Sequence, residues 1–241
     1  MKRRGLFITL EGIDGTGKST QHRLLAQYLA KSGYRVKATR EPGGTRLGEQ
    51  IRDIVLASNT GKLASLAELT LMYAARAQHL KEVVRPALHR GELVVSDRFN
   101  DASIAYQGYG RELGAATVHT IDQIICGPIQ PHLTLVLDLV PGIALARAHG
   151  REVHRKSKHG RFEAQGLNFH QRVRRGYLTI AKQEPARVKL INADRPVREV
   201  QAEIRVHVDL FLAKQGLSRK RKSASNGKGR KAKVTKRTNH Q

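Results

Sequence analysis

The sequence predicts a three-layer α/β fold, in which a five-stranded parallel sheet is flanked by helices. Apolar, β-branched runs typical of buried strands alternate along the chain with segments whose apolar residues recur at helical spacing. A glycine-rich octet directly follows the first apolar run and precedes a helical pattern, which is the expected place for a phosphate-binding loop. We therefore expect one compact domain whose ligand-binding loops lie at one edge of the sheet.

Each predicted element rests on its own local pattern. Strands are expected where apolar and β-branched residues cluster, over 6–12, 34–40, 92–97, 133–139 and 188–192. Helices are expected between Leu24 and Gly33 and over 64–89, 115–126, 141–148, 167–183 and 198–214. The segments 40–53 and 97–111 follow the second and third strands, and we interpret both as loops at the ligand-binding edge. The basic, glycine-rich stretch 147–166 is predicted to be a mobile surface segment, either a cover for bound phosphates or a plain solvated loop.

Charge is the unusual feature of the composition. The 241 residues include 44 Lys and Arg against 20 Asp and Glu, a net charge of +24, which should attract a polyanion. Residues 214–241 hold 11 of the basic residues and no acidic one, with almost no large apolar side chain. We predict a domain over 1–213 and a disordered basic tail over 214–241, which either binds nucleic acid or another polyanion weakly or only aids solubility.

Several classes of protein are excluded by absences in the sequence. No run of about 18 apolar residues exists that would cross a membrane, and the N-terminus reaches a charge too early for a secretory signal. The single cysteine, Cys126, cannot form an internal disulfide, and its apolar setting indicates a packed helix face rather than a catalytic thiol. These features predict a cytoplasmic protein without a membrane partner.

The octet Gly12–Ser19 fits the phosphate-binding pattern G-x-x-x-x-G-K-[ST]. Its glycines let backbone N–H groups surround an anion, and the following helix N-terminus adds partial positive charge. Lys18 is predicted to reach the β and γ phosphates, while the Ser19 hydroxyl is predicted to bind Mg²⁺. The predicted ATP-binding residues are Gly12, Ile13, Asp14, Gly15, Thr16, Gly17, Lys18, Ser19 and Thr20. Mg-ATP is therefore the expected first ligand, and the arginines of 40–53 and 97–111 suit a second anion opposite it.

The order and spacing of further motifs resemble the thymidylate kinase family over about residues 5–212. These motifs are GIDGTGKST, TREPGGT, GEQIRDIVL, YAARAQH, DRFNDASIAYQGYGR, LTLVLDL, RFE and FHQRVRRGY. The resemblance implies transfer of the γ-phosphoryl group of ATP to dTMP, which gives dTDP on the path to dTTP. It also implies a homodimer formed through the helices after the second and third strands.

The same resemblance assigns roles to individual positions. Arg98 and Arg52 should hold the dTMP phosphate beside Gln107, Asp14 should accept from the deoxyribose 3′-hydroxyl, and Asp97 should order the water shell of Mg²⁺. Arg76 and Ser103 should meet the thymine edge, Tyr106 the sugar, and Glu41 the same pocket. For several of these residues, a role limited to capping a helix or bracing a neighbouring loop stays open.

The family takes a transition-state arginine either from the phosphate-binding loop or from a lid, here about 149–165. Because this loop has Gly15 and Thr16 where an arginine would stand, the lid should supply it. Arg161 in RFE is the first candidate, with Arg151 and Arg155 as substitutes, and Lys18, Arg98, Arg161 and Asp14 form the predicted catalytic set.

The chain departs from the family pattern at two places besides the tail. Gly160 stands where the lid usually has an aspartate, and Met72 stands where an aromatic ring usually stacks on thymine. Two alternatives therefore stay open at this point. One is a related kinase with a different nucleotide or nucleoside acceptor, and the other is a P-loop protein whose main role is nucleic-acid binding.

Overall fold

The computed structural model describes residues 5–57, 63–155 and 160–217, with the backbone alone at 149 and 151–155. Five strands form one sheet: β1 (Leu6–Glu11), β2 (Val36–Arg40), β3 (Leu93–Asp97), β4 (Leu133–Asp138) and β5 (Val188–Asn192). Their order is β2-β3-β1-β4-β5, and every neighbouring pair is parallel. The predicted α/β fold and its five strands are confirmed.

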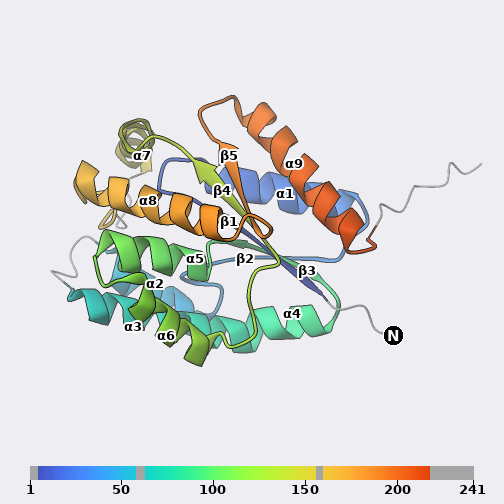
Figure 1. The fold of residues 1–241 in the computed structure, drawn as a ribbon, viewed down its shortest axis with the longest axis horizontal. Coiled ribbons are helices and arrows are strands. Elements are labelled where there is room, and N and C mark those ends of the chain that lie inside the picture. The colour runs from blue at the N-terminus through green and yellow to red at the C-terminus, as the bar shows by residue number, and fades with distance from the viewer. Residues whose placement is uncertain (1–4, 58–62, 156–159, 218–241) are drawn as a thin grey trace, which may run out of the picture.

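Helices cover both faces of this sheet (Figure 1). One face carries α1 (Lys18–Lys31) and α9 (Val197–Lys214), which contact each other as well as the strands. The opposite side carries a continuous helical run of α3 (Ser65–His79), the π-helical turn η1 (Leu80–Val84) and α4 (Arg85–His89). It also carries α6 (Ala115–Ile125) and α8 (Leu167–Gln183), so the parallel sheet is buried as such sheets require.

The central strands explain why the chain folds this way. Every residue of β1 is buried, and Phe7, Ile8 and Leu10 are completely enclosed, as are Val94 and Val95 of β3. A run that is apolar on both faces is typical of an inner parallel strand. Since these strands end in register, their carboxyl ends deliver polar residues to one edge of the sheet, where the ligand-binding loops were expected.

The interpretation of 40–53 and 97–111 as loops was wrong in part. Residues Arg46–Leu56 form α2, whose N-terminus is capped by the Thr45 side chain accepting from the Gly48 amide at 3.0 Å. Residues Asn100–Ser103 form α5, which runs into the π-helical segment η2 (Ile104–Gly110). This second helix packs closely against α8, because Gly176 of α8 has no Cβ, and a Cβ there would lie 3.0 Å from the Ala105 Cα.

Two boundaries also differ from prediction. The helix predicted over 141–148 continues as α7 (Pro141–Arg155), because the helix-forming residues around Gly150 outweigh the cost of one glycine. Of the segment 147–166 that was predicted to be mobile, residues 156–159 lie outside the described residues, as do the side chains of 149 and 151–155. The folded chain continues past the predicted boundary at 213 to Leu217, which packs on the core and whose amide donates to the Leu212 carbonyl at 2.9 Å across Gly216. The rest of the predicted tail, 218–241, lies outside the described residues.

The predictions about membrane-spanning helices and about Cys126 concern residues that the structure describes. No helix within 5–57, 63–155 and 160–217 is long and apolar enough to cross a membrane. Cys126 is completely buried beside the end of α6, as expected for a packed thiol, and its pKa is raised by that burial.

Candidate active site

A cleft of about 850 Å³ opens at the carboxyl edge of the sheet. Its walls come from α1, the loop after β2, α3, α5 with η2, and the residues around α7 and 160–163. Eleven predicted site residues line it: Asp14, Ser19, Thr20, Glu41, Arg52, Met72, Arg76, Arg98, Ser103, Tyr106 and Gln107. Residues predicted from segments far apart in sequence are thus brought into one cavity.

The glycine-rich loop has the conformation that its sequence predicts. Gly12, Gly15 and Gly17 all have positive φ, of 131°, 88° and 89°, which residues with a Cβ rarely adopt. A Cβ on Gly15 would lie 1.8 Å from the Ala144 carbonyl oxygen of α7, so only glycine fits there. Because Gly17 directly precedes α1, the N-terminus of this helix, with its partial positive charge, lies at the mouth of the cleft.

The charged groups of this loop are held in place by one another. Lys18 is buried, and its Nζ donates to the Ile13 carbonyl at 2.8 Å and lies 3.7 Å from Asp14 Oδ1. Burial and the nearby Arg98 guanidinium lower the pKa of Lys18 to about 8. Burial would raise the pKa of Asp14, yet Arg98 and Lys18 together hold it well below the ordinary value. Asp14 is therefore a carboxylate at neutral pH.

Arg98 is the central cation of the cleft. Its Nη2 donates to Asp14 Oδ1 at 2.7 Å and to the Tyr106 hydroxyl at 3.0 Å, and Tyr106 in turn donates to Asp14 Oδ2 at 3.0 Å. Its Nη1 donates to the Tyr177 hydroxyl at 3.2 Å. These contacts fix the guanidinium group between the phosphate-binding loop and η2, where an anionic ligand would meet it.

Ser19 and Asp97 form a hydrogen bond between the phosphate-binding loop and the neighbouring strand β3. The Ser19 hydroxyl donates to Asp97 Oδ2 at 2.9 Å, which joins the start of α1 to the end of β3. Within the described residues no cluster of three or more His, Cys, Asp or Glu side chains forms a metal site. A hydroxyl and one carboxylate nevertheless fit Mg²⁺ in a nucleotide site, since that ion keeps several waters and takes further ligands from substrate phosphates.

Arg76 is buried at the bottom of the acceptor side. Its Nε donates to Glu41 Oε2 at 2.7 Å, and its Nη2 donates to the Phe99 carbonyl and to Ser103 Oγ, each at 3.0 Å. Its Nη1 is buried without a hydrogen-bond partner in the described part of the chain. The Arg76 side chain lines the cleft, so a bound ligand can supply an acceptor for this orphan donor.

Other predicted residues also meet partners inside the protein. Glu41 holds Arg76 and lies 2.8 Å from His79 Nδ1, and these partners lower its pKa despite burial, so it braces Arg76. Arg52 donates to the Pro42 carbonyl at 2.9 Å and still lines the cleft. Gln107 donates to Glu68 Oε1 at 2.8 Å. Sequence spacing indicated the positions of these residues but not this bracing.

The structure does not bring Arg161 to the cleft. Its guanidinium group is ion-paired with the fully buried Glu68 of α3, and its Nη1 also donates to the Val55 carbonyl at 3.2 Å. Phe162 and Glu163, the next two residues, line the cleft instead. The side chains of Arg151 and Arg155 lie outside the described part of the structure.

Three residues that matter to this geometry were missed by sequence analysis. Glu68 holds Gln107 and Arg161, Glu11 receives hydrogen bonds beneath Arg98, and Tyr177 contacts both Glu11 and Arg98. No local motif identifies Glu68, and Glu11 looked like the last residue of a strand. Tyr177 is the last residue of the motif FHQRVRRGY, but its contacts depend on how α8 packs against β1 and η2.

The fold and the cleft define a P-loop phosphotransferase, with a nucleotide-binding loop on one wall and several guanidinium groups facing it. The family model for thymidylate kinase matches residues 10–204. A thymidylate kinase of Desulfovibrio desulfuricans is 44% identical over 213 residues, which cover 88% of this chain and 98% of that protein. One from Pseudomonas savastanoi is 48% identical, covering 83% of this chain and 93% of that protein.

A solved structure agrees with these sequence matches. The crystal structure of thymidylate kinase from Ehrlichia chaffeensis superposes with a TM-score of 0.69 at 32% identity, covering 85% of this chain and 98% of that chain. The chain belongs to the thymidylate kinase family, and it is a phosphotransferase that phosphorylates dTMP. The alternatives of another acceptor kinase and of a nucleic-acid-binding P-loop protein gain no support from these matches.

Proposed function

We propose that the cleft binds Mg-ATP and dTMP together and forms dTDP and ADP by direct transfer. The observation that carries this proposal is that one cavity is lined by the phosphate-binding loop and by the guanidinium groups of Arg52, Arg76 and Arg98. A phosphate oxygen of dTMP attacks the γ-phosphorus while the bond from that phosphorus to the β–γ bridging oxygen breaks. The attacking oxygen is already anionic, so the protein needs to align two anions rather than supply a strong base.

The donor side is assigned to the loop before α1. Backbone N–H groups of 12–20 would surround the ATP phosphates, and Lys18 would leave the Ile13 carbonyl to reach the β and γ phosphates. Mg²⁺, held by Ser19 directly and by Asp97 through water, would neutralise charge on the phosphate oxygens. Because burial lowers the pKa of Lys18, a phosphate partner would stabilise its charged form more than it would that of an exposed lysine.

The acceptor side is assigned to residues after β2 and β3. Arg98 and Arg52, beside Gln107, would hold the dTMP phosphate, and the unpaired Nη1 of Arg76 would donate to the thymine edge near Ser103. Asp14 would accept from the 3′-hydroxyl of deoxyribose. Tyr106 would pack against the sugar, since its hydroxyl already lies on Asp14.

Arg161 is assigned to the transferred phosphoryl group, with Arg151 and Arg155 as substitutes. In the present arrangement Arg161 is bound to Glu68, so this role requires residues 160–163 to shift and the ion pair to break. Closure of the lid over bound phosphates would bring that change about.

An assay of ADP release tests the reaction and its acceptor. Purified protein is supplied with Mg-ATP and, in separate reactions, with dTMP, dUMP, dGMP, dCMP or thymidine. We expect dTMP to give the highest kcat/KM, and the ratio of dTMP to dUMP to report how well Met72 selects the thymine methyl group. Equal rates with and without dTMP would contradict the assignment.

We also propose a cytoplasmic homodimer, formed through α2, α3 and α6. Large apolar side chains are exposed on these helices, at Leu47, Ile54, Leu66 and Ile124. Such side chains would be covered when two copies meet through the same faces. Sedimentation equilibrium measures this directly, and a purely monomeric protein at micromolar concentration would contradict it.

A further inference from the structure

Arg98 is held in a backbone conformation that it would rarely adopt alone. Its φ is 74°, in the left-handed region, although it has a Cβ. Such a residue stays in place only when neighbouring groups fix it from several sides. Its own N–H donates to the Leu10 carbonyl at 3.0 Å, and its carbonyl accepts from Ser96 Oγ at 2.7 Å.

The next peptide group is fixed by Glu11. The Phe99 N–H donates to Glu11 Oε1 at 2.7 Å, so the peptide plane that follows Arg98 is tied to the end of β1. This bond is buried, since Glu11 and Phe99 are both completely enclosed. Loss of the acceptor would leave the Phe99 N–H without its partner in a site closed to water.

The second oxygen of Glu11 reaches the side chain of Arg98 through one intermediate. The Tyr177 hydroxyl donates to Glu11 Oε2 at 2.9 Å and accepts from Arg98 Nη1 at 3.2 Å. A hydroxyl that gives its proton to Glu11 offers its lone pairs to Arg98. One carboxyl group therefore orients both the backbone and the guanidinium group of the same arginine.

The electrostatic surroundings suit a buried group with this task. Burial and the nearby Asp101 raise the pKa of Glu11 to about 8, while Arg98 opposes that shift. Glu11 also lies near enough to Lys18 of the phosphate-binding loop to raise the pKa of that lysine slightly when the carboxyl group is ionised. It lies outside the cavity lining and is placed to act on the substrate only through its neighbours.

We propose that Glu11 is a positioning residue for acceptor binding, which sets Arg98 through the Phe99 amide and the Tyr177 hydroxyl. The inference rests on the proposed role of Arg98 at the dTMP phosphate. Glu11 would then affect dTMP affinity and turnover without contacting the substrate.

The test compares Glu11→Leu with Glu11→Gln in the full-length protein. Leucine removes both hydrogen bonds at similar volume, so kcat/KM for dTMP should fall about 10- to 100-fold. Glutamine keeps an oxygen for the Phe99 amide and a polar group for Tyr177, so it should stay within about fivefold of the wild type. The KM for ATP should change less than the KM for dTMP in both variants, because the phosphate-binding loop keeps its own contacts.

Three further variants separate positioning from loss of stability. Val208→Ala, a core truncation in α9 remote from Arg98, should lower the melting temperature yet keep kcat/KM at permissive temperature. Tyr177→Phe should reduce kcat/KM for dTMP on its own but add little in the Glu11→Leu background, since both changes break the same route. If Arg98→Ala left dTMP binding unchanged, the assigned role of Arg98 would fail first.

Two outcomes would overturn the inference while leaving the assigned role of Arg98 intact. One is an unchanged kcat/KM for dTMP in Glu11→Leu when Arg98→Ala is impaired. The other is that Val208→Ala, at the same melting temperature as Glu11→Leu, loses as much kcat/KM for dTMP as Glu11→Leu does. In that outcome the KM for ATP and the KM for dTMP would rise together in both variants.

Discussion

Asp14 and Arg98 are paired with each other in the cleft. Their 2.7 Å contact and the Tyr106 hydroxyl satisfy both carboxylate oxygens of Asp14. A buried arginine that already has a carboxylate partner carries its charge at lower cost than an unpaired one. In the binding mode proposed above, dTMP would rearrange this network: Arg98 would turn toward the phosphate, and Asp14 would accept from the sugar hydroxyl.

The titration of Glu11 makes stability depend on pH in a definite window. The folded protein keeps a proton on Glu11 up to about pH 8, whereas an unfolded glutamate loses it near its ordinary pKa of 4.5. Between these values the folded state binds more protons, so stability should fall as pH rises, by at most about 1.4 kcal/mol per pH unit. Urea unfolding at pH 5, 6.5 and 8 measures this slope.

Glu11→Gln should flatten that slope because an amide cannot titrate. The control is Glu92→Gln, since the Arg90 side chain lowers the pKa of this partly buried carboxyl and places its titration below the window. It should keep the wild-type slope. Asp14 and Lys18 have shifted pKa values that act below pH 4 and above pH 8 respectively, so neither masks the effect. Parallel slopes in the wild type and Glu11→Gln would refute the assignment.

Sequence motifs located most of the residues in the cleft but not their bonds to one another. Arg76 was expected at the thymine edge, which stays a prediction; the structure shows that Arg76 lines the cleft and that its Nη1 has no partner in the described part of the chain. Glu41 was expected in the same pocket, which it lines, but the sequence did not reveal that its two oxygens are used by Arg76 and His79. Side-chain pairing of this kind depends on distances between elements far apart in sequence, which residue spacing does not contain.

At the scale of elements, the helical segment 100–110 shows where local pattern fails. Its glycines and small polar residues favour a loop, yet burial against α6 and α8 makes it helical. A Cβ at Gly110 would lie 2.8 Å from the Phe169 ring, so glycine permits close approach rather than breaking the helix. In contrast, the strands were predicted well because an inner parallel strand is apolar along its whole length.

The ion pair between Arg161 of the lid and Glu68 of α3 means that removing Arg161 also removes a contact between these two elements. Arg161→Ala should lower kcat by about 10³-fold with a much smaller change in nucleotide affinity, if Arg161 stabilises the transferred phosphoryl group. Arg111 is the matched control because it also pairs with Glu68, at 3.1 Å, and is not assigned to the chemistry. Arg111→Ala should lower kcat less than about tenfold.

Steady-state and single-turnover kinetics distinguish the two variants. Equal losses in kcat from Arg161→Ala and Arg111→Ala would mean that Arg161 acts by bracing α3 through Glu68. Unchanged turnover in Arg161→Ala would assign the transition-state charge to Arg151 or Arg155 instead.

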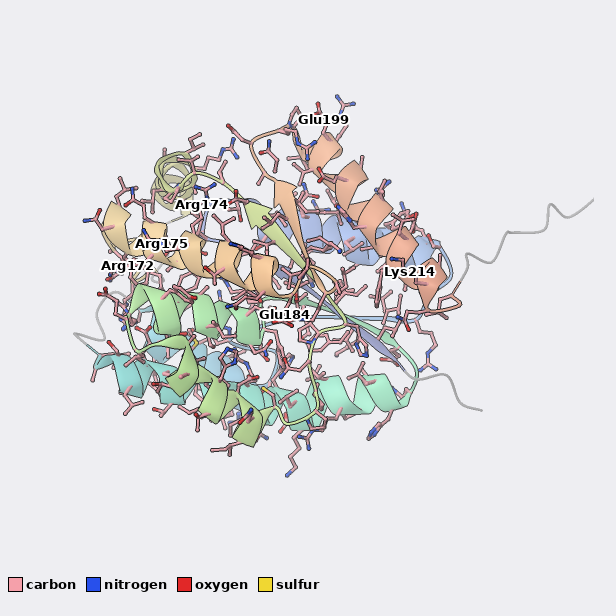
Figure 2. The ribbon with its side chains drawn as sticks, in the orientation of Figure 1. Arg172, Arg174, Arg175, Glu184, Glu199 and Lys214 are labelled. Atoms are coloured by element: carbon pink, nitrogen blue, oxygen red, sulfur yellow. The ribbon has the colours of Figure 1, made fainter. Side chains whose placement is uncertain are left out.

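Across the whole molecule, the positive charge is divided between the folded domain and the residues that follow it. Arg172, Arg174 and Arg175 lie along α8, and Lys214 lies at the end of α9 that is remote from α7 (Figure 2). Arg174 pairs with Asp138 and Arg172 with Glu112, so part of the charge on α8 is compensated. Residues 218–241 contain ten basic and no acidic side chains, with no such compensation within the segment.

We propose that 218–241 binds nucleic acid or another polyanion electrostatically, independently of the kinase reaction. Deleting 218–241 should leave kcat/KM for dTMP within about twofold, because the chain leaves the domain far from α7 and the cleft. Retention on heparin and on single-stranded DNA should drop sharply. The salt dependence of DNA binding by the full chain should be steep, since each neutralised phosphate releases counterions.

The deletion must begin after Leu217, so that the folded domain stays complete. Tyr34 donates to the Leu217 carbonyl at 3.0 Å, so a cut at 214 would remove part of the folded domain and lower stability for an unrelated reason. A variant that keeps 218–241 but replaces its ten Lys and Arg with Ser or Gln separates charge from length. If that variant bound DNA as the full chain does, the electrostatic role would be excluded; if the deletion abolished turnover, the residues after 217 would belong to the enzyme itself.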